Sequence, residues 1–301
     1  MVDRITSFVH TNQLINGNLR VQSRYAEGQV QLSTGYKSET FEGLAAESSR
    51  ILNLESDVKR ITAQTENAEI ALNRTEVMFD ALGTVIDIGR SFAADLGSAI
   101  SGINIQPSQI QDIAIQQLEV TAAALNTQFA GRYVFSGSAT QTAPVDLNAA
   151  GWGGAVIPSA ADTGYYQGNS FIQSVEAADG FTLSYGLTAD DTGLEQIIRA
   201  FDLVRTTPGD TATLQEALVL LQAGLDSVAE TKARVSQDSQ SLSAQIDQNQ
   251  EDLTLTSKLI TELKEVDLAE VSVRLQQLEA QLEASYSVTA DLLRLSLTDF
   301  I

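Results

Sequence analysis

Few residues in this sequence could do chemistry. His10 is the only histidine, and no acidic or hydroxyl residue lies three or four positions after it to orient the ring for acid–base work. Asp190 and Asp191 could be a pair of calcium ligands, but acidic residues where a helix begins need no metal. Asn73-Arg74-Thr75 matches the N-glycosylation pattern, yet it falls inside a predicted helix.

Patterns typical of enzymes do not appear in the sequence. There is no HExxH, no glycine-rich phosphate loop before a helix, and no cysteine for thiol or disulfide chemistry. The formal net charge of -21 repels phosphate backbones and anionic lipid, and no run approaches the ~18 apolar residues that cross a bilayer. We therefore expect no enzyme, with no catalytic residue, cofactor or metal, and neither nucleic acid nor a membrane as partner.

Two long helices are predicted by hydrophobic periodicity, because apolar or small residues recur at alternating steps of three and four. At ~1.5 Å per residue, the first would span roughly 75 Å. The predicted contact positions of the first are Ile51, Leu54, Val58, Ile61, Thr65, Ala68, Leu72, Thr75, Phe79, Leu82, Ile86, Gly89, Ala93, Leu96 and Ile100. Those of the second are Leu214, Leu218, Leu221, Leu225, Val228, Lys232, Val235, Ser239, Leu242, Ile246, Asn249, Leu253, Thr256, Ile260 and Leu263. Two such stripes bury each other only if the helices lie side by side, so we expect mainly α structure built on long antiparallel helical rods.

The terminal segments are predicted to be amphipathic helical arms, whose stripes of apolar residues are interrupted by polar ones. The first runs from Val2 to about Leu32 and stops at Gly35, and the last begins at a capping signal formed by Asp267 and Glu270. Helices with such diluted stripes are marginal alone, so the arms should pair and assemble with other copies, and should be mobile in the free monomer. The expected assembly interface comprises Ile5, Phe8, Ile15, Leu19, Leu275, Leu278, Leu282, Leu293, Leu297 and Phe300.

The middle of the chain differs in composition. Between Arg132 and Arg199 there is no lysine or arginine, and short β-prone runs over 133–135, 165–175 and 181–185 alternate with glycine-containing turns. We expect a small β-rich inserted domain at the tip of the rods, separate from them and dispensable for their folding, with 149–154 as a mobile loop. A helix capped by Ser108 and Gln111 should precede it and end at Gly131.

A return helix should follow the insert, opened by Thr192 and Glu195 and closed at Pro208-Gly209. The predicted organisation is an N-terminal arm over 1–42, rod helices over 43–131 and 193–266, the β-rich insert over 132–192, and a C-terminal arm over 267–301.

Several motifs resemble the flagellin family. Leu32-Ser33-Thr34-Gly35 resembles the motif that closes the N-terminal arm of flagellins, and Gly43-Leu44-Ala45 resembles the stretch that leads into their long helix. The segment Asn126–Gly137 and the ending Leu295–Ile301 are more similar to the family's hook–filament junction proteins, the third hook-associated proteins. The alternative is a filament flagellin, major or minor, against which the last two motifs argue.

The resemblance implies a structural protein of the bacterial flagellum: a subunit of a junction ring that joins hook to filament by self-assembly. It implies that the terminal arms form an inner coiled-coil layer and that the insert faces outward. Expected partners are further copies in the ring, a hook-side junction protein, flagellin, and an export chaperone on the C-terminal arm. The expected location is extracellular, after type III export without a cleaved signal. The N-terminus, Met1–Thr6, lacks the basic region plus apolar core of a cleavable secretory signal.

Overall fold

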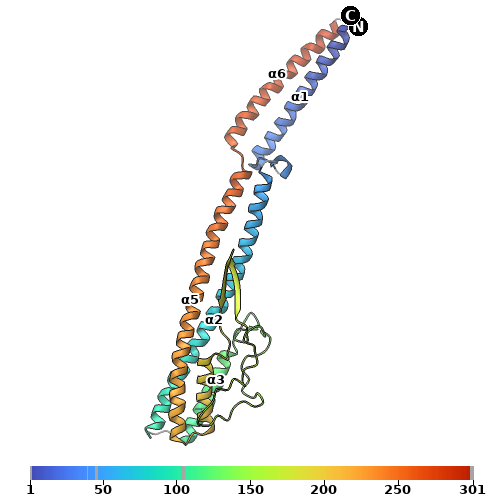
Figure 1. The fold of residues 1–301 in the computed structure, drawn as a ribbon. Coiled ribbons are helices and arrows are strands. Elements are labelled where there is room, and N and C mark those ends of the chain that lie inside the picture. Colours follow the sequence, from blue (N-terminus) through green and yellow to red (C-terminus); the bar gives the residue numbers. More distant parts are fainter. Residues whose placement is uncertain (1, 39, 45–46, 103–105, 299–301) are drawn as a thin grey trace. The chain divides into compact units, whose positions relative to one another are not determined.

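The chain is mainly helical, as predicted. The computed structural model describes residues 2–38, 40–44, 47–102 and 106–298, and of residues 2–11, 41–42 and 291–298 it describes the backbone alone. The chain divides into two compact units, one made of Met1–Lys59 with Leu253–Ile301 (unit 1) and the other of Arg60–Asp252 (unit 2). The long helices α2 (Ser48–Ile100) and α5 (Thr211–Lys264) contribute residues to both units (Figure 1).

In unit 2, α2 and α5 pack side by side and run antiparallel. The hydroxyl of Ser239 donates to that of Thr75 over 2.9 Å. One turn further along α2, the ammonium of Lys232 lies 4.1 Å from the centre of the Phe79 ring. Every predicted contact position on the two helices is buried or half-buried. The alternation of threes and fours therefore marks the contact face.

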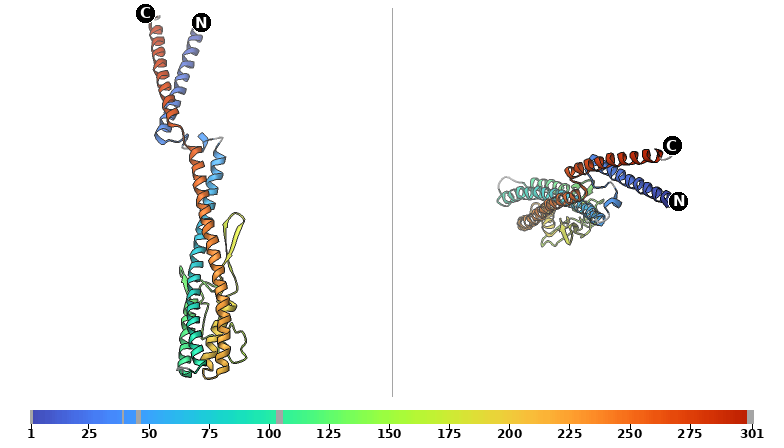
Figure 2. Two further views of the ribbon diagram at one scale, coloured as in Figure 1. Left: turned by 90° about the vertical axis from the view of Figure 1, so that its left-hand side faces the viewer. Right: turned by 90° about the horizontal axis from the view of Figure 1, so that it is seen from above.

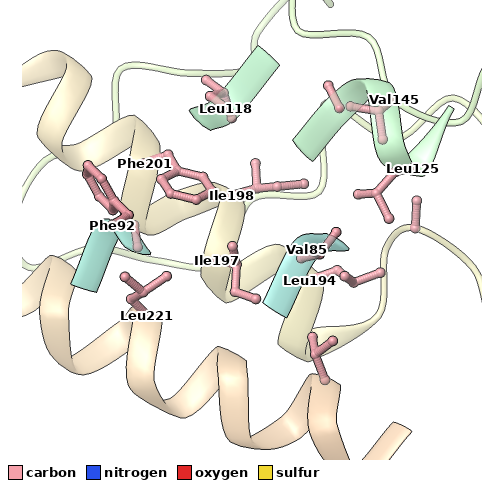
Figure 3. Packing of buried hydrophobic residues seen from close by; sticks show 14 of the residues in the cluster. Val85, Phe92, Leu118, Leu125, Val145, Leu194, Ile197, Ile198, Phe201 and Leu221 are labelled. Carbon is pink, nitrogen blue, oxygen red and sulfur yellow. The ribbon is translucent and has the colours of Figure 1, made fainter. Parts of the chain in front are cut away.

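A second stripe on α2 is also buried within unit 2, and the sequence analysis did not identify it. Its members recur every seven residues: Gln64, Ala71, Met78, Val85 and Phe92. Helices α3 (Pro107–Leu125) and α4 (Thr192–Thr206) supply the neighbours that most of this stripe needs. The rings of Phe92 and Phe201, for example, meet edge to face with their centres 5.0 Å apart (Figure 3). Because α2 has partners on two sides here, it buries two stripes.

Two predicted helix boundaries on α3 were wrong. The helix begins at Pro107, whose fixed φ suits a first helical position, and the Gln109 side chain accepts from the Gln106 N–H over 2.9 Å. It ends at Leu125 rather than Gly131. Asn126 stops the helix, and its side-chain amide pairs with the Val145 main chain through two hydrogen bonds of 2.9 Å. Phe129 lies beyond the helix, in the short strand β1 (Gln128–Phe129), which pairs with β2 (Arg132–Tyr133).

Helix α4 begins at Thr192, as predicted, but the residue that caps it was not predicted. The carboxylate of Asp191, not Thr192, caps the helix by accepting from the Gly193 N–H over 3.0 Å. The helix ends at Thr206, just before the predicted Pro208-Gly209 stop.

The inserted segment contains little regular structure. In the part of the chain that is described, its main sheet is the hairpin of β3 (Gln173–Ala178) and β4 (Phe181–Tyr185), paired in antiparallel register with Val175 opposite Leu183. The expected strand over 165–175 was therefore placed too early. Tyr165 itself is fully buried, and its hydroxyl donates to the Ala189 carbonyl over 2.9 Å.

The expectation that this segment sits at the tip of the rods as a separate unit was wrong. It belongs to unit 2, and its buried residues Phe135, Tyr165 and Ala189 are part of the main hydrophobic cluster. Its contacts extend along α5 from Glu216 to Asn249. This packing could not be predicted from the sequence, because apolar residues in irregular segments follow no period that indicates what they pack against.

Three carboxylates on α4 and α5 hold the irregular part of the insert in place. Each accepts from a main-chain N–H: Asp202 from Ala155 over 2.7 Å, Glu216 from Ser159 over 2.8 Å, and Glu195 from Asp162 over 2.9 Å. Glu195 and Asp202 are almost fully buried and are paired with Arg199 and Arg205 respectively. Charge-assisted bonds of this kind are strong when desolvated, so a segment without basic residues of its own is anchored by the helices beneath it.

Candidate assembly interface

The predicted interface residues lie on α1 (Val2–Thr34) and α6 (Leu268–Thr298), which pair in unit 1. The amide of Gln22 donates to the Tyr286 hydroxyl, and that of Asn18 donates to the Thr289 hydroxyl over 3.4 Å. Residues earlier in α1 therefore meet residues later in α6, so the pair is antiparallel. The two helices diverge toward the chain ends (Figure 2).

The two helices come close together at Gly28. A Cβ atom at this position would lie 2.8 Å from a terminal carbon of Leu275, so glycine is what lets the helices meet here. Around this point α6 buries Val271, Leu275 and Leu278. Toward the chain ends the described contacts become polar, as in the bond between Ser285 and Asn18. The described apolar contact within the pair is thus concentrated near the end of α1 and the start of α6.

The predicted interface residues have different environments. Leu275 and Leu278 are buried within the pair and Leu282 is half-buried. Ile15 and Leu19, by contrast, are 44% and 56% exposed. The side chains of Ile5, Phe8, Leu293 and Leu297, and all of Phe300, lie outside the described residues. The pair alone therefore does not cover the apolar face of α1.

Further apolar side chains on these helices are exposed although they were not predicted as interface residues. They include Val30 and Leu32 on α1, and Val273 and Val288 on α6, all more than two-fifths exposed. Val30 belongs to the apolar stripe predicted for the first arm, whereas Leu32, Val273 and Val288 were assigned to no stripe. The signal for these three was their position: an aliphatic residue off the stripe has no partner within a two-helix pair.

A short clasp joins the arms to the long helices within unit 1. It consists of Gly35–Lys37 paired with Lys264–Val266: the Lys37 N–H donates to the Lys264 carbonyl over 2.8 Å, and the Val266 N–H donates to the Gly35 carbonyl over 2.9 Å. The Lys37 ammonium also donates to the Leu263 carbonyl over 2.9 Å, which places a cation at the C-terminal end of α5. The clasp keeps the end of α1 next to the start of α6.

Both helix ends at the clasp follow from the sequence as predicted. Gly35 has a φ of +75°, which favours glycine, and its N–H donates to the Gln31 carbonyl over 2.8 Å. The carboxylate of Asp267 accepts from the N–H groups of Ala269 and Glu270, over 2.8 and 3.2 Å.

A cavity of about 800 Å³ lies beside the clasp. Its lining consists of Thr34, Tyr36, Ser38, Thr40, Leu44, Glu55 and Lys264. Lys264 and Glu55 are joined by an ion pair of 2.6 Å. Among the cavity's described lining residues there is no histidine.

Two of the residues whose types could do chemistry have structural surroundings. Asp191 is a helix cap, and the Asn73 side chain is exposed on α2, where it donates to the Glu69 carbonyl over 2.8 Å. The His10 side chain lies outside those that the structure describes. Among the described residues, no group of three or more histidine, cysteine or acidic side chains is placed to hold a metal ion. In the same part of the chain, none of the helices has the length and hydropathy that crossing a bilayer requires.

The raised pKa values of two tyrosines in unit 2 also have structural causes. Burial raises the pKa of Tyr165 far above its ordinary value, and the nearby Glu195 carboxylate raises it further. Burial raises the pKa of Tyr166 to about 12, and its hydroxyl donates to the Asn169 carbonyl over 2.7 Å. Both hydroxyls are thus held neutral as donors to main-chain carbonyls, within the packed insert.

Solved structures share this fold. A protein from Vibrio parahaemolyticus whose structure is described as that of a flagellar hook-associated protein matches with a TM-score of 0.56 and 18% identity, over 72% of this chain and 97% of that one. FlgL from Bacillus cereus matches with a TM-score of 0.50 and 16% identity, over 73% of this chain and 99% of its own. No protein-family model and no curated protein sequence matches this chain. At these identities the likeness establishes a common, mainly helical fold.

Proposed function

We propose that this chain is a structural subunit of the bacterial flagellum that joins the hook to the filament, assembling as a ring through its terminal helices. The observation that carries the proposal is the α1–α6 pair, in which Leu275 and Leu278 are buried while Ile15 and Leu19 stay about half exposed. A two-helix pair with an uncovered apolar face is suited to further helices. The fold shared with FlgL and with a hook-associated protein supports this role.

In the assembled ring, neighbouring copies would cover the exposed face of α1. Ile5, Phe8, Leu293, Leu297 and Phe300 would extend the same interface toward the chain ends. The proposed partners are further copies, a hook-side junction protein, flagellin and, before assembly, an export chaperone on the C-terminal arm. The protein would act outside the cell after export without a cleaved signal.

The decisive experiment places the protein on the flagellum. Immunogold labelling of an epitope-tagged chain should mark a single band between hook and filament, and cells lacking the chain should carry hooks without filaments. Label along the whole filament would instead indicate a filament flagellin. Normal filaments in the deletion strain, with no label at the junction, would refute both roles.

The free monomer should not hold the arms firmly. Ordering ~65 residues costs on the order of 1–2 kcal/mol each, which the short apolar contact around Gly28 could hardly offset. Limited proteolysis of purified monomer should remove Met1–Leu32 and Leu268–Ile301 first, and a truncation after Arg294 should fold but fail to join hook to filament. Strong amide protection across both arms in monodisperse monomer would contradict this.

A matched pair of glycine substitutions tests whether arm pairing matters for assembly. Gly28→Leu should force α1 away from Leu275, whereas Gly17→Leu places the same side chain where nothing lies within 4 Å of a Cβ. Both changes alter helix propensity alike. We expect only Gly28→Leu to abolish filament attachment in a complementation assay. Equal motility in the two strains would show that assembly does not require the pairing of α1 with α6.

A further inference from the structure

Over residues 64–75 of α2, the side chains that face α5 in unit 2 are mostly small or polar, although α5 contributes the buried Leu242 and Ile246. The main hydrophobic cluster reaches Met78 on α2 and Val235 on α5 and goes no further along either helix. Beyond it the facing positions include Ala68, Ala71 and the hydrogen-bonded hydroxyls of Thr75 and Ser239. Small and hydroxyl side chains bury too little apolar area to hold a two-helix contact firmly.

The β3–β4 hairpin covers this stretch. Its inward side chains Ala177 and Tyr185 form a separate hydrophobic cluster with Ala68 and Ala71 of α2 and with residues of α5. The α5 members are Leu242 and Ile246, and Leu72, Val175 and Leu183 pack at the edge. The hairpin therefore supplies a third layer where α3 and α4 supply none.

A β-bulge gives the hairpin a specific bond to α5. The strand register shifts between Glu176 and Ala178, so Ala177 has no partner opposite it in the ladder. Its carbonyl accepts instead from the side-chain amide of Asn249 over 2.9 Å. Asn249 is only 3% exposed, and its own carbonyl oxygen accepts from Gln245 over 2.9 Å. The Ala177 carbonyl and the Asn249 side-chain N–H are thus paired with each other only while the hairpin is docked.

The turn of the hairpin is bound to the other helix. The carboxylate of Asp179 forms an ion pair of 2.5 Å with Arg60 and accepts from the Gln64 amide over 3.0 Å. The Asp179 carboxylate is 65% exposed, so this contact is screened by solvent and weaker than the buried one. One hairpin therefore binds α5 through Asn249 and α2 through Arg60 and Gln64.

We propose that the β3–β4 hairpin is a releasable strap, whose docking holds α2 and α5 together over residues 64–75 and 239–249. When the strap lifts, the carbonyl of Ala177 and the amide of Asn249 lose their partners and the cluster around Ala68 is uncovered. The helices in this stretch then separate locally while the rest of unit 2 stays packed. The strap concerns motion within one chain and is independent of the proposed place of the protein in the flagellum.

Native-state hydrogen exchange on the full chain tests the strap. Asn249→Ala removes the buried bond, and we expect amides in 64–75, 173–185 and 239–249 to exchange on the order of 10- to 100-fold faster. Amides in 82–96 and 214–228 should not change. The matched control is Gln248→Ala, because Gln248 is the adjacent amide on α5 but its side chain is exposed and bonds to Asp252. Equal effects of the two substitutions, or faster exchange throughout unit 2, would overturn the proposal.

A second experiment closes the strap again. The chain contains no cysteine, so cysteines replacing Gln64 and Asp179 can be joined by a short bifunctional thiol reagent without side reactions. In the Asn249→Ala background this link should return the exchange of 64–75 and 239–249 to within about threefold of the wild-type rate. If the linked variant still exchanges fast, the effect of Asn249→Ala arises within α5 and the hairpin is not a strap.

Discussion

The α1–α6 pair of unit 1 and the α2–α5 pair of unit 2 are built from the same kind of pattern and differ in what surrounds them. In unit 2, α3, α4 and the insert add neighbours, so Leu82, Leu96 and Leu221 are all fully buried. In unit 1 the described parts of the two arm helices pack mainly against each other, and Leu19 stays 56% exposed. Amphipathic spacing therefore identifies the apolar face of a helix. The number of neighbouring elements decides whether that face is fully buried within the chain.

This difference suggests separate roles for the two regions. A region that buries its own stripes is stable by itself, and a region that leaves them open is suited to bind other chains. The variants below test that division, in order of decreasing expected effect on the free energy of unfolding.

The largest loss of stability should come from a charge in unit 2, the region that buries its own apolar stripes. Leu242→Asp buries an unpaired carboxylate at a fully buried position and should cost more than about 4 kcal/mol. Leu255→Asp, on the same helix but at a 58% exposed position, should cost less than about 0.5 kcal/mol. Denaturant unfolding followed by circular dichroism measures both. If the two variants were similarly stable, the predicted difference between buried and exposed positions on α5 would be wrong.

A substitution in the insert, with the next largest expected effect, tests whether the insert contributes to the stability of unit 2. Tyr165→Ala deletes a fully buried ring that packs edge to face on Trp152, with ring centres 5.9 Å apart, and should cost about 3–5 kcal/mol. Tyr286→Ala on α6 removes a 48% exposed ring and should cost about 1 kcal/mol or less. Trp152 is the only tryptophan, so its fluorescence reports specifically on the insert. An unchanged unfolding midpoint for Tyr165→Ala would mean that the insert is dispensable after all.

Alkaline pH should weaken unit 2 by a smaller amount. The folded-state pKa of Tyr166 is raised by burial to about 12 from an ordinary 10.0, so between these values the unfolded chain loses a proton that the folded chain keeps. Stability is therefore fully present below pH 10 and falls as the pH rises toward 12. Tyrosinate absorbance and thermal unfolding, measured together, should show this fall, and Tyr166→Phe should make it shallower. An identical profile for Tyr166→Phe would assign the fall to other groups.

The smallest effect on stability should accompany the largest effect on assembly. Leu19→Ser changes an exposed side chain and should alter the unfolding free energy by less than about 0.5 kcal/mol. It should nevertheless prevent filament attachment in complemented cells, because the face of α1 would lose apolar contact area. Normal motility with this variant would place the assembly contacts elsewhere on the arms.

The sequence by itself determined the long helices and the helix ends at the clasp, though not the ends of α3. The three-four spacing over 51–100 and 214–263 identified the contact faces, because a helix repeats locally and its period is visible along the chain. Gly35 and Asp267 marked the helix ends at the clasp, because left-handed backbone and caps depend on neighbouring residues. The weak stripes of the arms indicated helices that need partners, and the exposure of Ile15 and Leu19 agrees with that expectation.

Only the tertiary structure decided what packs against those faces. The seven-residue stripe of Gln64, Met78 and Phe92 is buried because α3, α4 and the insert lie beside it, and α4 and the insert are far from α2 in sequence. The insert is held along the helices by N–H bonds to buried carboxylates such as Glu195, a pairing that no local motif indicates. Such contacts join residues tens of positions apart, so they depend on how the whole chain folds. That is why the sequence located the helices and the structure alone located the insert.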